Sequence, residues 1–187
     1  MKENLIFSNR KRISARLIVS KVLHLINSVS EYSGKIVSFL VWAGALVLAY
    51  EVVARYLFNS PTVWVHGYSQ RIFATYFILI GAFTLLKGGH VRVDILTLMF
   101  SSYRVRKAFD LINYAFLIFW GGFLVKEGWR LFLTSWKIKE IDEMVLGHPI
   151  YPFKFILVVG ALLITLQAGA FFAISLTSFI KGQDYEL

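Results

Sequence analysis

The stretch FILVVGALLITLQAGAFFAISLTSFI, residues 155–180, contains no charged side chain. A helix needs about 20 mostly apolar residues to cross a bilayer, and this stretch exceeds that length. Three more stretches are also long and apolar enough to cross, namely residues 36–58, 65–86 and 109–133. The sequence therefore predicts an all-α integral membrane protein with four transmembrane helices, formed by residues 36–180.

The overall composition supports this class. Hydrophobic residues make up 57% of the 187 residues, charged residues make up 17%, and the mean hydropathy is +0.64. Typical soluble domains have about 45–50% apolar and about 25% charged residues. Disordered, collagen-like and plain soluble proteins are therefore excluded. The chain has no cysteine, which excludes disulfides, thiolate metal sites and thiol redox chemistry.

The basic residues are unevenly distributed between the apolar stretches, and the net charge is +9. Lys and Arg gather in residues 1–35 and 87–107, whereas residues 59–64 carry none. The positive-inside rule then places both termini in the cytoplasm, including the tail 181–187. We expect a multi-pass protein of a bacterial or archaeal inner membrane, with residues 59–64 and 134–152 outside. The cations fit phospholipid headgroups better than nucleic acid.

Residues 1–35 form a basic N-terminal segment with an apolar stripe at helical spacing. Its members are Ile18, Val22, Leu25, Val29, Tyr32 and Ile36. This pattern predicts an amphipathic helix in the cytoplasmic interface, with Arg12 and Arg16 at lipid headgroups. The alternative is a helical extension that packs on the transmembrane helices.

A second, short interfacial segment is predicted after the second span. Residues 91–100 are largely apolar but too few to cross the membrane. The basic residues Arg104, Arg106 and Lys107 follow and suit the headgroup level.

No pattern in the chain predicts catalysis or a cofactor. The histidines lie in connections or interfacial segments, where they cannot form the facing pairs that a haem-binding bundle needs. No metal-binding spacing, nucleophile motif or phosphate loop is present in the sequence. We therefore expect neither an enzyme nor a resident metal, and a membrane electron-transfer subunit is the weakest alternative.

Ionisable residues within apolar spans are candidates for functional contacts. Glu51 and Arg55 lie four residues apart and therefore share one face of a helix. They form either an internal ion pair or a contact with a partner subunit. Arg71 enters the second span from the same side and could join them.

The fourth span carries a ridge of small residues, a pattern that lets another helix approach closely. It consists of Ala161, Thr165, Gly169, Ala173 and Thr177. The ridge packs either within the chain's own helices or against a different chain.

Two motifs resemble the small membrane subunit, the DctQ-like component, of tripartite ATP-independent periplasmic (TRAP) transporters. The first is EVVARYLFNSPTVW, residues 51–64, which ends at Trp64, a further candidate for the interface with a partner subunit. The second is GGHVRVD, residues 88–94, which contains Gly88, Gly89, His90, Arg92 and Asp94. One departure is His66-Gly67, where the family commonly has an acidic pair.

The resemblance implies a non-catalytic scaffold subunit of a secondary transporter. Its partners would be a large elevator-type membrane subunit, which binds substrate and sodium, and a periplasmic binding protein that delivers an organic acid. The alternative from the residues alone is a self-assembling four-helix adaptor or channel.

Overall fold

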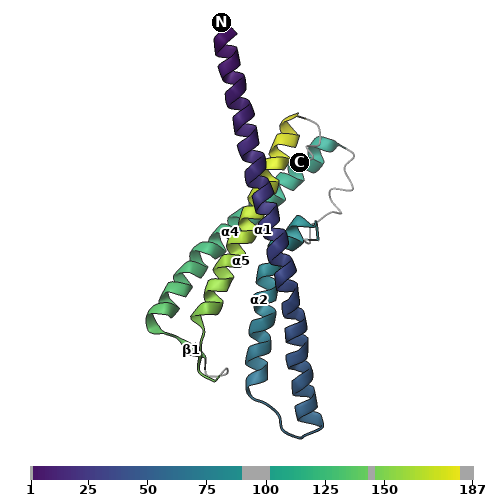
Figure 1. The fold of residues 1–187 in the computed structure, drawn as a ribbon, viewed down its shortest axis with the longest axis vertical. Helices are drawn as coiled ribbons and strands as arrows, with labels where there is room; N and C mark the ends of the chain where they lie inside the picture. Colours follow the sequence, from purple (N-terminus) through teal and green to yellow (C-terminus); the bar gives the residue numbers. More distant parts are fainter. Residues whose placement is uncertain (1, 90–101, 143–145, 182–187) are drawn as a thin grey trace.

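The computed structural model describes residues 2–89, 102–142 and 146–181, with side chains described from Lys21 to Ile180 (Figure 1). Four long helices make up most of these residues. They are α1 (Lys2–Tyr56), α2 (Trp64–Leu86), α4 (Tyr103–Ile138) and α5 (Tyr151–Lys181). Two short antiparallel strands, β1 (Ile141–Asp142) and β2 (His148–Pro149), form a hairpin between α4 and α5.

The prediction of four membrane-spanning helices is confirmed. Each long helix contains a window apolar enough to cross a bilayer, over Lys21–Leu57, Trp64–Leu86, Tyr103–Ile138 and Tyr151–Ile180. Helix α4 extends beyond the predicted 109–133 at both ends. The additional residues include charged side chains but no proline, so the helix continues where the apolar pattern stops.

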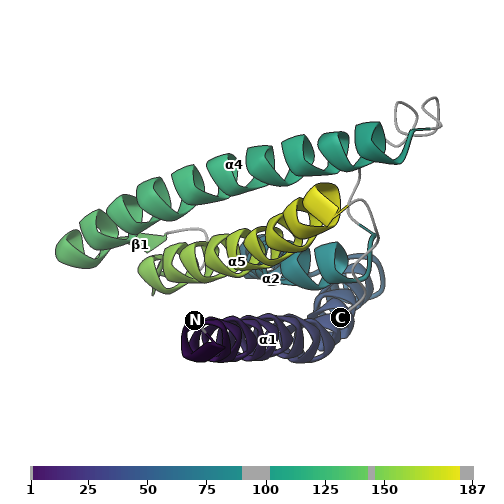
Figure 2. The same cartoon turned by 90° about the horizontal axis from the view of Figure 1, so that it is seen from above.

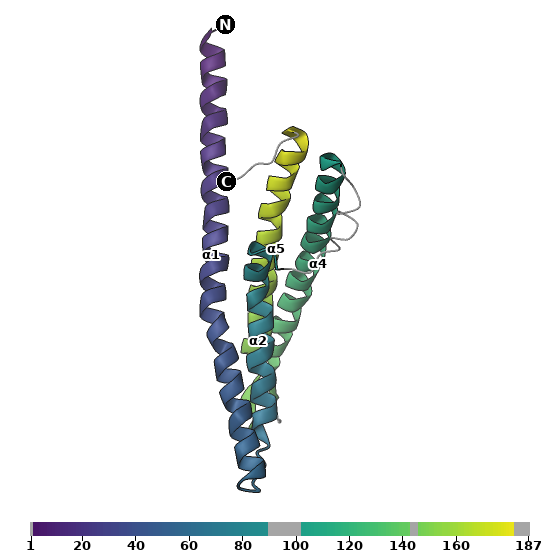
Figure 3. The ribbon, with the colours of Figure 1, turned by 90° about the vertical axis from the view of Figure 1, so that its right-hand side faces the viewer.

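The N-terminal segment differs from the predicted separate helix, because α1 is continuous from Lys2 to Tyr56 (Figure 3). Gly34 has the lowest helix propensity of the residues between Lys21 and Gly44, and it serves packing, because a Cβ there would lie 2.3 Å from Cγ of Phe83. The predicted interfacial position of this segment stays a prediction.

The apolar stripe of α1 does not pack on the other helices in the described part of the chain. Leu25 and Tyr32 are 65% and 71% exposed, whereas Leu23 and Val37 on the opposite face are buried. The stripe therefore faces away from the protein's interior, whereas the opposite face of this helical extension packs on α2 and α5.

The helices pack in the spatial order α1, α2, α5, α4, so that α1 and α4 lie on opposite sides (Figure 2). Helix α1 also meets α5 through a smaller contact. Close approach between α2 and α5 depends on Gly160, where a Cβ would lie 2.8 Å from the backbone oxygen of Ile78. The apolar core forms around Leu85, Tyr114 and Ala168, which come from α2, α4 and α5.

A buried polar junction joins α1 to α5. Gln167 is fully buried; its Oε1 accepts a hydrogen bond of 2.8 Å from Ser30, and its Nε2 donates one of 2.9 Å to Asn27. Because both ends of the amide are bonded, the one strongly polar side chain near the middle of the fourth span is satisfied within the chain.

Candidate functional site

The first family-like motif forms the corner between α1 and α2. Oε1 of Glu51 accepts hydrogen bonds from Arg55, at 2.5 Å from Nη2 and 3.0 Å from Nε. The other carboxylate oxygen accepts from the backbone and the hydroxyl of Thr62. Asn59 adopts a left-handed conformation, with φ of 48°, which lets the chain reverse after α1. Glu51 therefore fixes the corner from inside the chain.

Aromatic rings continue this corner towards the hairpin. Trp64 stacks on Tyr50, with ring centroids 5.9 Å apart, and meets the edge of Tyr68 at 5.8 Å. The Tyr68 ring in turn contacts the ring of His148 in β2 at 5.9 Å. This row links α1, α2 and the hairpin, and it gives Trp64 a role within the chain.

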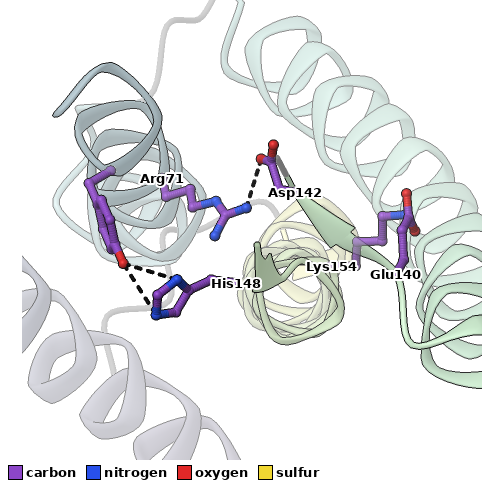
Figure 4. Close-up of polar contacts among 6 residues, drawn as sticks. Arg71, Glu140, Asp142, His148 and Lys154 are labelled. Atoms are coloured by element: carbon purple, nitrogen blue, oxygen red, sulfur yellow. Dashed lines mark hydrogen bonds and ion pairs between the residues drawn. The ribbon is translucent and has the colours of Figure 1, made fainter. Parts of the chain in front are cut away.

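Two ion pairs attach the hairpin to the helices (Figure 4). Nη2 of Arg71 lies 2.7 Å from Oδ2 of Asp142, and the guanidinium stacks over the Phe153 ring at 4.6 Å. Nζ of Lys154 lies 2.5 Å from Oε2 of Glu140. Arg71 thus pairs with the hairpin, and the expectation that it joins Glu51 and Arg55 is wrong, because Asp142 of the hairpin reaches it instead.

The Lys154 ammonium also changes the acidity of its partner. Its hydrogen bond lowers the pKa of the Glu140 carboxyl group below the usual 4.5. Glu140 is therefore ionised at neutral pH, and the hairpin's pair with α5 is a charged one.

The departure at His66-Gly67 has a structural counterpart in this corner. His66 is exposed, Gly67 is buried, and neither supplies an acid to α2. The carboxylate that meets Arg71 in this chain comes from Asp142, on the connection between α4 and α5.

The second family-like motif begins at the end of α2. Gly88 has φ of 71°, and the N–H of Gly89 donates to the carbonyl oxygen of Thr84 at 2.9 Å. This is a Schellman-type ending, which favours glycine at the left-handed position. The rest of the motif, His90, Arg92 and Asp94, lies outside the described residues, as does the predicted interfacial segment 91–100.

The small-residue ridge of α5 is used partly within the chain. Ala161 is buried, and Thr165 lies so close to α4 that a Cβ on Gly121 would meet its Oγ1 at 2.1 Å. A Cβ on Gly169 would meet nothing within 4 Å, and Ala173 is exposed. The second half of the ridge, Gly169 and Ala173, lines a shallow pocket together with Val22, Leu23 and Ile26 of α1.

The predicted headgroup contacts are described only on α4. Arg104 and Arg106 are exposed in its first turns, and Nζ of Lys107 lies 5.6 Å from the Tyr103 ring centroid. The side chains of Arg12 and Arg16 lie outside those that the structure describes. Lipid contact by all five residues stays a prediction.

A groove opens between α2 and α5 beside the hairpin, with a volume of about 320 Å³. Its wall includes Gln70, Arg71 and Lys154 near the hairpin and Ala74 and Leu157 further along the helices. Within the described ranges, no group of three or more His, Asp or Glu side chains is placed to hold a metal ion. The chemistry of this region is that of paired charges and an amphipathic groove.

Sequence reasoning missed the hairpin residues. Glu140, Asp142 and His148 come from a short polar connection without a periodic pattern, so no local signal indicates which helix they meet. Residues 137–143 contain two lysines and three acidic residues. This mixture of charges was the one feature of the sequence that could have indicated ion pairs in the connection.

Comparison with known protein families gives one match. The model described as "Tripartite ATP-independent periplasmic transporters, DctQ component" matches residues 44–177. This range includes α2, α4 and the hairpin in full, together with the membrane-spanning end of α1 and most of α5. A search of curated proteins gives no match.

Proposed function

The chain belongs to the DctQ component family of tripartite ATP-independent periplasmic transporters, and we propose that it is a non-catalytic scaffold subunit. As a member with four membrane-spanning helices, it is a multi-pass inner-membrane protein and a component of a transporter. In our proposal it holds a large elevator-type membrane subunit in place while that subunit moves substrate.

The scaffold role is supported by the way the charges are used. Glu51, Arg71 and Glu140 each contact a partner group within the chain, and these contacts fasten the helices and the hairpin together at one end. A carrier instead needs polar groups near mid-depth that are available to an ion or substrate. Gln167, the strongly polar group of the fourth span, is already bonded on both sides.

Substrate and energy source belong to the partners in this proposal. The large subunit binds an organic acid together with sodium, and a periplasmic binding protein delivers that acid. The test is uptake of labelled organic acids into liposomes with an imposed sodium gradient and the binding protein, where the membrane contains this chain alone, the large subunit alone, or both. Uptake should require the large subunit. Sodium-driven uptake by this chain alone would refute the scaffold role.

The orientation in the membrane is a further part of the proposal. Both termini lie in the cytoplasm, because the exposed cations Lys87, Arg104 and Arg106 flank the connection between α2 and α4. The hairpin and the α1–α2 corner then face the periplasm. Reporter fusions at Ser60 and after residue 187 test this, and periplasmic activity of the second fusion would contradict it.

The contact with the large subunit is best sought at the predicted interface residues that remain exposed. The Arg55 side chain is 54% exposed although it pairs with Glu51, and Ala173 is exposed on α5. Arg55→Gln should lower co-purification of the large subunit. Arg130→Gln is the matched control, because Arg130 is 76% exposed and also pairs with an acid on its own helix. If both variants recovered as much of the large subunit as wild type does, the interface would lie elsewhere.

A further inference from the structure

The corner between α1 and α2 presents apolar side chains to its surroundings. Leu57, Phe58 and Val63 are 76%, 73% and 85% exposed, and Pro61 between them is exposed as well. We call these four residues the apolar tip. Residues 56–63 carry no charge. Apolar side chains on the flank of a membrane helix can contact lipid, so the position of the tip relative to the bilayer decides what can cover it.

The tip lies beyond the lipid on the hairpin side. The uncharged stretch of α5 begins directly after Lys154, and the ion pairs that Lys154 and Arg71 make with the hairpin mark the edge of the hydrocarbon, where charges are costly. On α2, Trp64 precedes Arg71 by seven residues, which is about 10 Å of helix. The headgroup layer is only about 5–7 Å thick. The corner therefore projects past this layer, and it lies further along the long axis of the molecule than the hairpin does (Figure 1).

The tip is held in one conformation from inside the chain. The Glu51 carboxylate accepts hydrogen bonds from both the backbone N–H and the hydroxyl of Thr62. At the start of α2, the Trp64 ring stacks on Tyr50 of α1. A surface that is already ordered loses little conformational freedom when it binds, so more of the gain from burying apolar area appears as affinity. The tip is therefore a preformed apolar surface in water, which is suited to contact with a protein.

We propose that the apolar tip docks the periplasmic binding protein, through an apolar patch on that protein, when substrate is delivered. This inference rests on the proposed function and on the proposed orientation, which places the corner in the periplasm. Four side chains fit a small, transient interface of less than about 1,200 Å² in total, whereas permanent complexes usually bury about 2,000 Å² or more. A soluble protein that leaves after each delivery fits the smaller class, and a permanent membrane partner does not.

The test is biolayer interferometry of the binding protein from the same genome on the complex of this chain with the large subunit in phospholipid nanodiscs. Phe58→Ser and Val63→Ser should each weaken binding by about tenfold. The matched control is Ile141→Ser, because Ile141 is an apolar hairpin residue on the same side of the membrane and is 60% exposed. The control should bind as wild type does, and the melting temperature of each variant checks that it is folded.

The outcomes separate this inference from the proposed function. Wild-type affinity in both tip variants would overturn docking at the tip and leave the proposed function standing. Weaker binding by the hairpin control alone would place the docking surface on the hairpin and would also overturn it. No binding by the wild-type complex would contradict the proposed function together with the tip.

A second measurement shows what covers the tip before docking. The chain contains no cysteine, so Ser60→Cys provides one site at the corner for a polarity-sensitive fluorophore. In nanodiscs the label should emit as in water, and its emission should shift to shorter wavelength when the binding protein is added. The labelling background comes from the complex without this cysteine. Short-wavelength emission before that addition would show that lipid or the large subunit already covers the tip, and the proposal would be wrong.

Discussion

Replacing Gly160 by alanine adds a methyl group where α2 and α5 cross. The new Cβ would lie 2.3 Å from Cγ2 of Ile78, and also 2.8 Å from its backbone oxygen and 3.0 Å from its backbone carbon. A rotamer change of Ile78 would relieve the first contact only. The two helices must therefore separate for the methyl group to fit.

The size of this effect follows from two opposing terms. Overpacking a well-packed interface costs about 1–3 kcal/mol. Alanine is favoured over glycine within a helix by about 0.5–1 kcal/mol, which offsets part of that cost. We expect Gly160→Ala to lower the free energy of unfolding by about 1–2 kcal/mol. Gly169→Ala is the matched control on the same helix, because a Cβ there meets nothing within 4 Å.

The assay is equilibrium unfolding in mixed micelles of mild detergent and dodecyl sulfate, followed by circular dichroism and tryptophan fluorescence. The control variant should be as stable as wild type or more stable by up to about 1 kcal/mol. If Gly160→Ala were equally stable, α2 and α5 would not cross closely at this point.

Three other predictions concern the polar contacts. In a double-mutant cycle, Arg71→Gln and Asp142→Asn should show a coupling energy of about 1–3 kcal/mol in unfolding, and additive effects would show that the pair does not hold the hairpin. Ser30→Ala should cost about 1 kcal/mol because it leaves Oε1 of Gln167 without its donor, and the loss should vanish in a Gln167→Leu background. The lowered pKa of Glu140 means that its stabilisation is complete above pH 4.5 and is lost as the pH falls through the folded-state pKa. The melting temperature of Glu140→Gln should therefore fall less than that of wild type below pH 4.5, and parallel curves would argue against the pair.

The spans themselves were predictable because they depend on composition alone. Residues 155–180 contain no charge, and no other environment accommodates such a stretch as well as a bilayer does. The length of α1 was not predictable in this way. An apolar pattern marks where a span can lie, whereas helix ends depend on breakers and caps. The glycine in this segment, Gly34, packs against Phe83 and does not end the helix.

The site was only partly predictable for a related reason. Glu51 and Arg55 are four residues apart on one helix, so their contact follows from helical geometry. Arg71 and Asp142 are separated by most of two helices, and their contact depends on how the helices pack. The pairing of Gln167 with Ser30 has the same origin. Local spacing predicts contacts within a helix. The packing order α1, α2, α5, α4 does not follow from local spacing and is known only from the structure.

The central claim is that this chain works as one subunit of a membrane complex with a large TRAP subunit. Its most direct test is the native mass of the tagged chain after co-expression with the large membrane subunit from the same genome. We predict a hetero-complex that contains one copy of each membrane protein. A homo-oligomer of this chain, with the large subunit expressed in the same membranes but absent from the purified particle, would contradict the account.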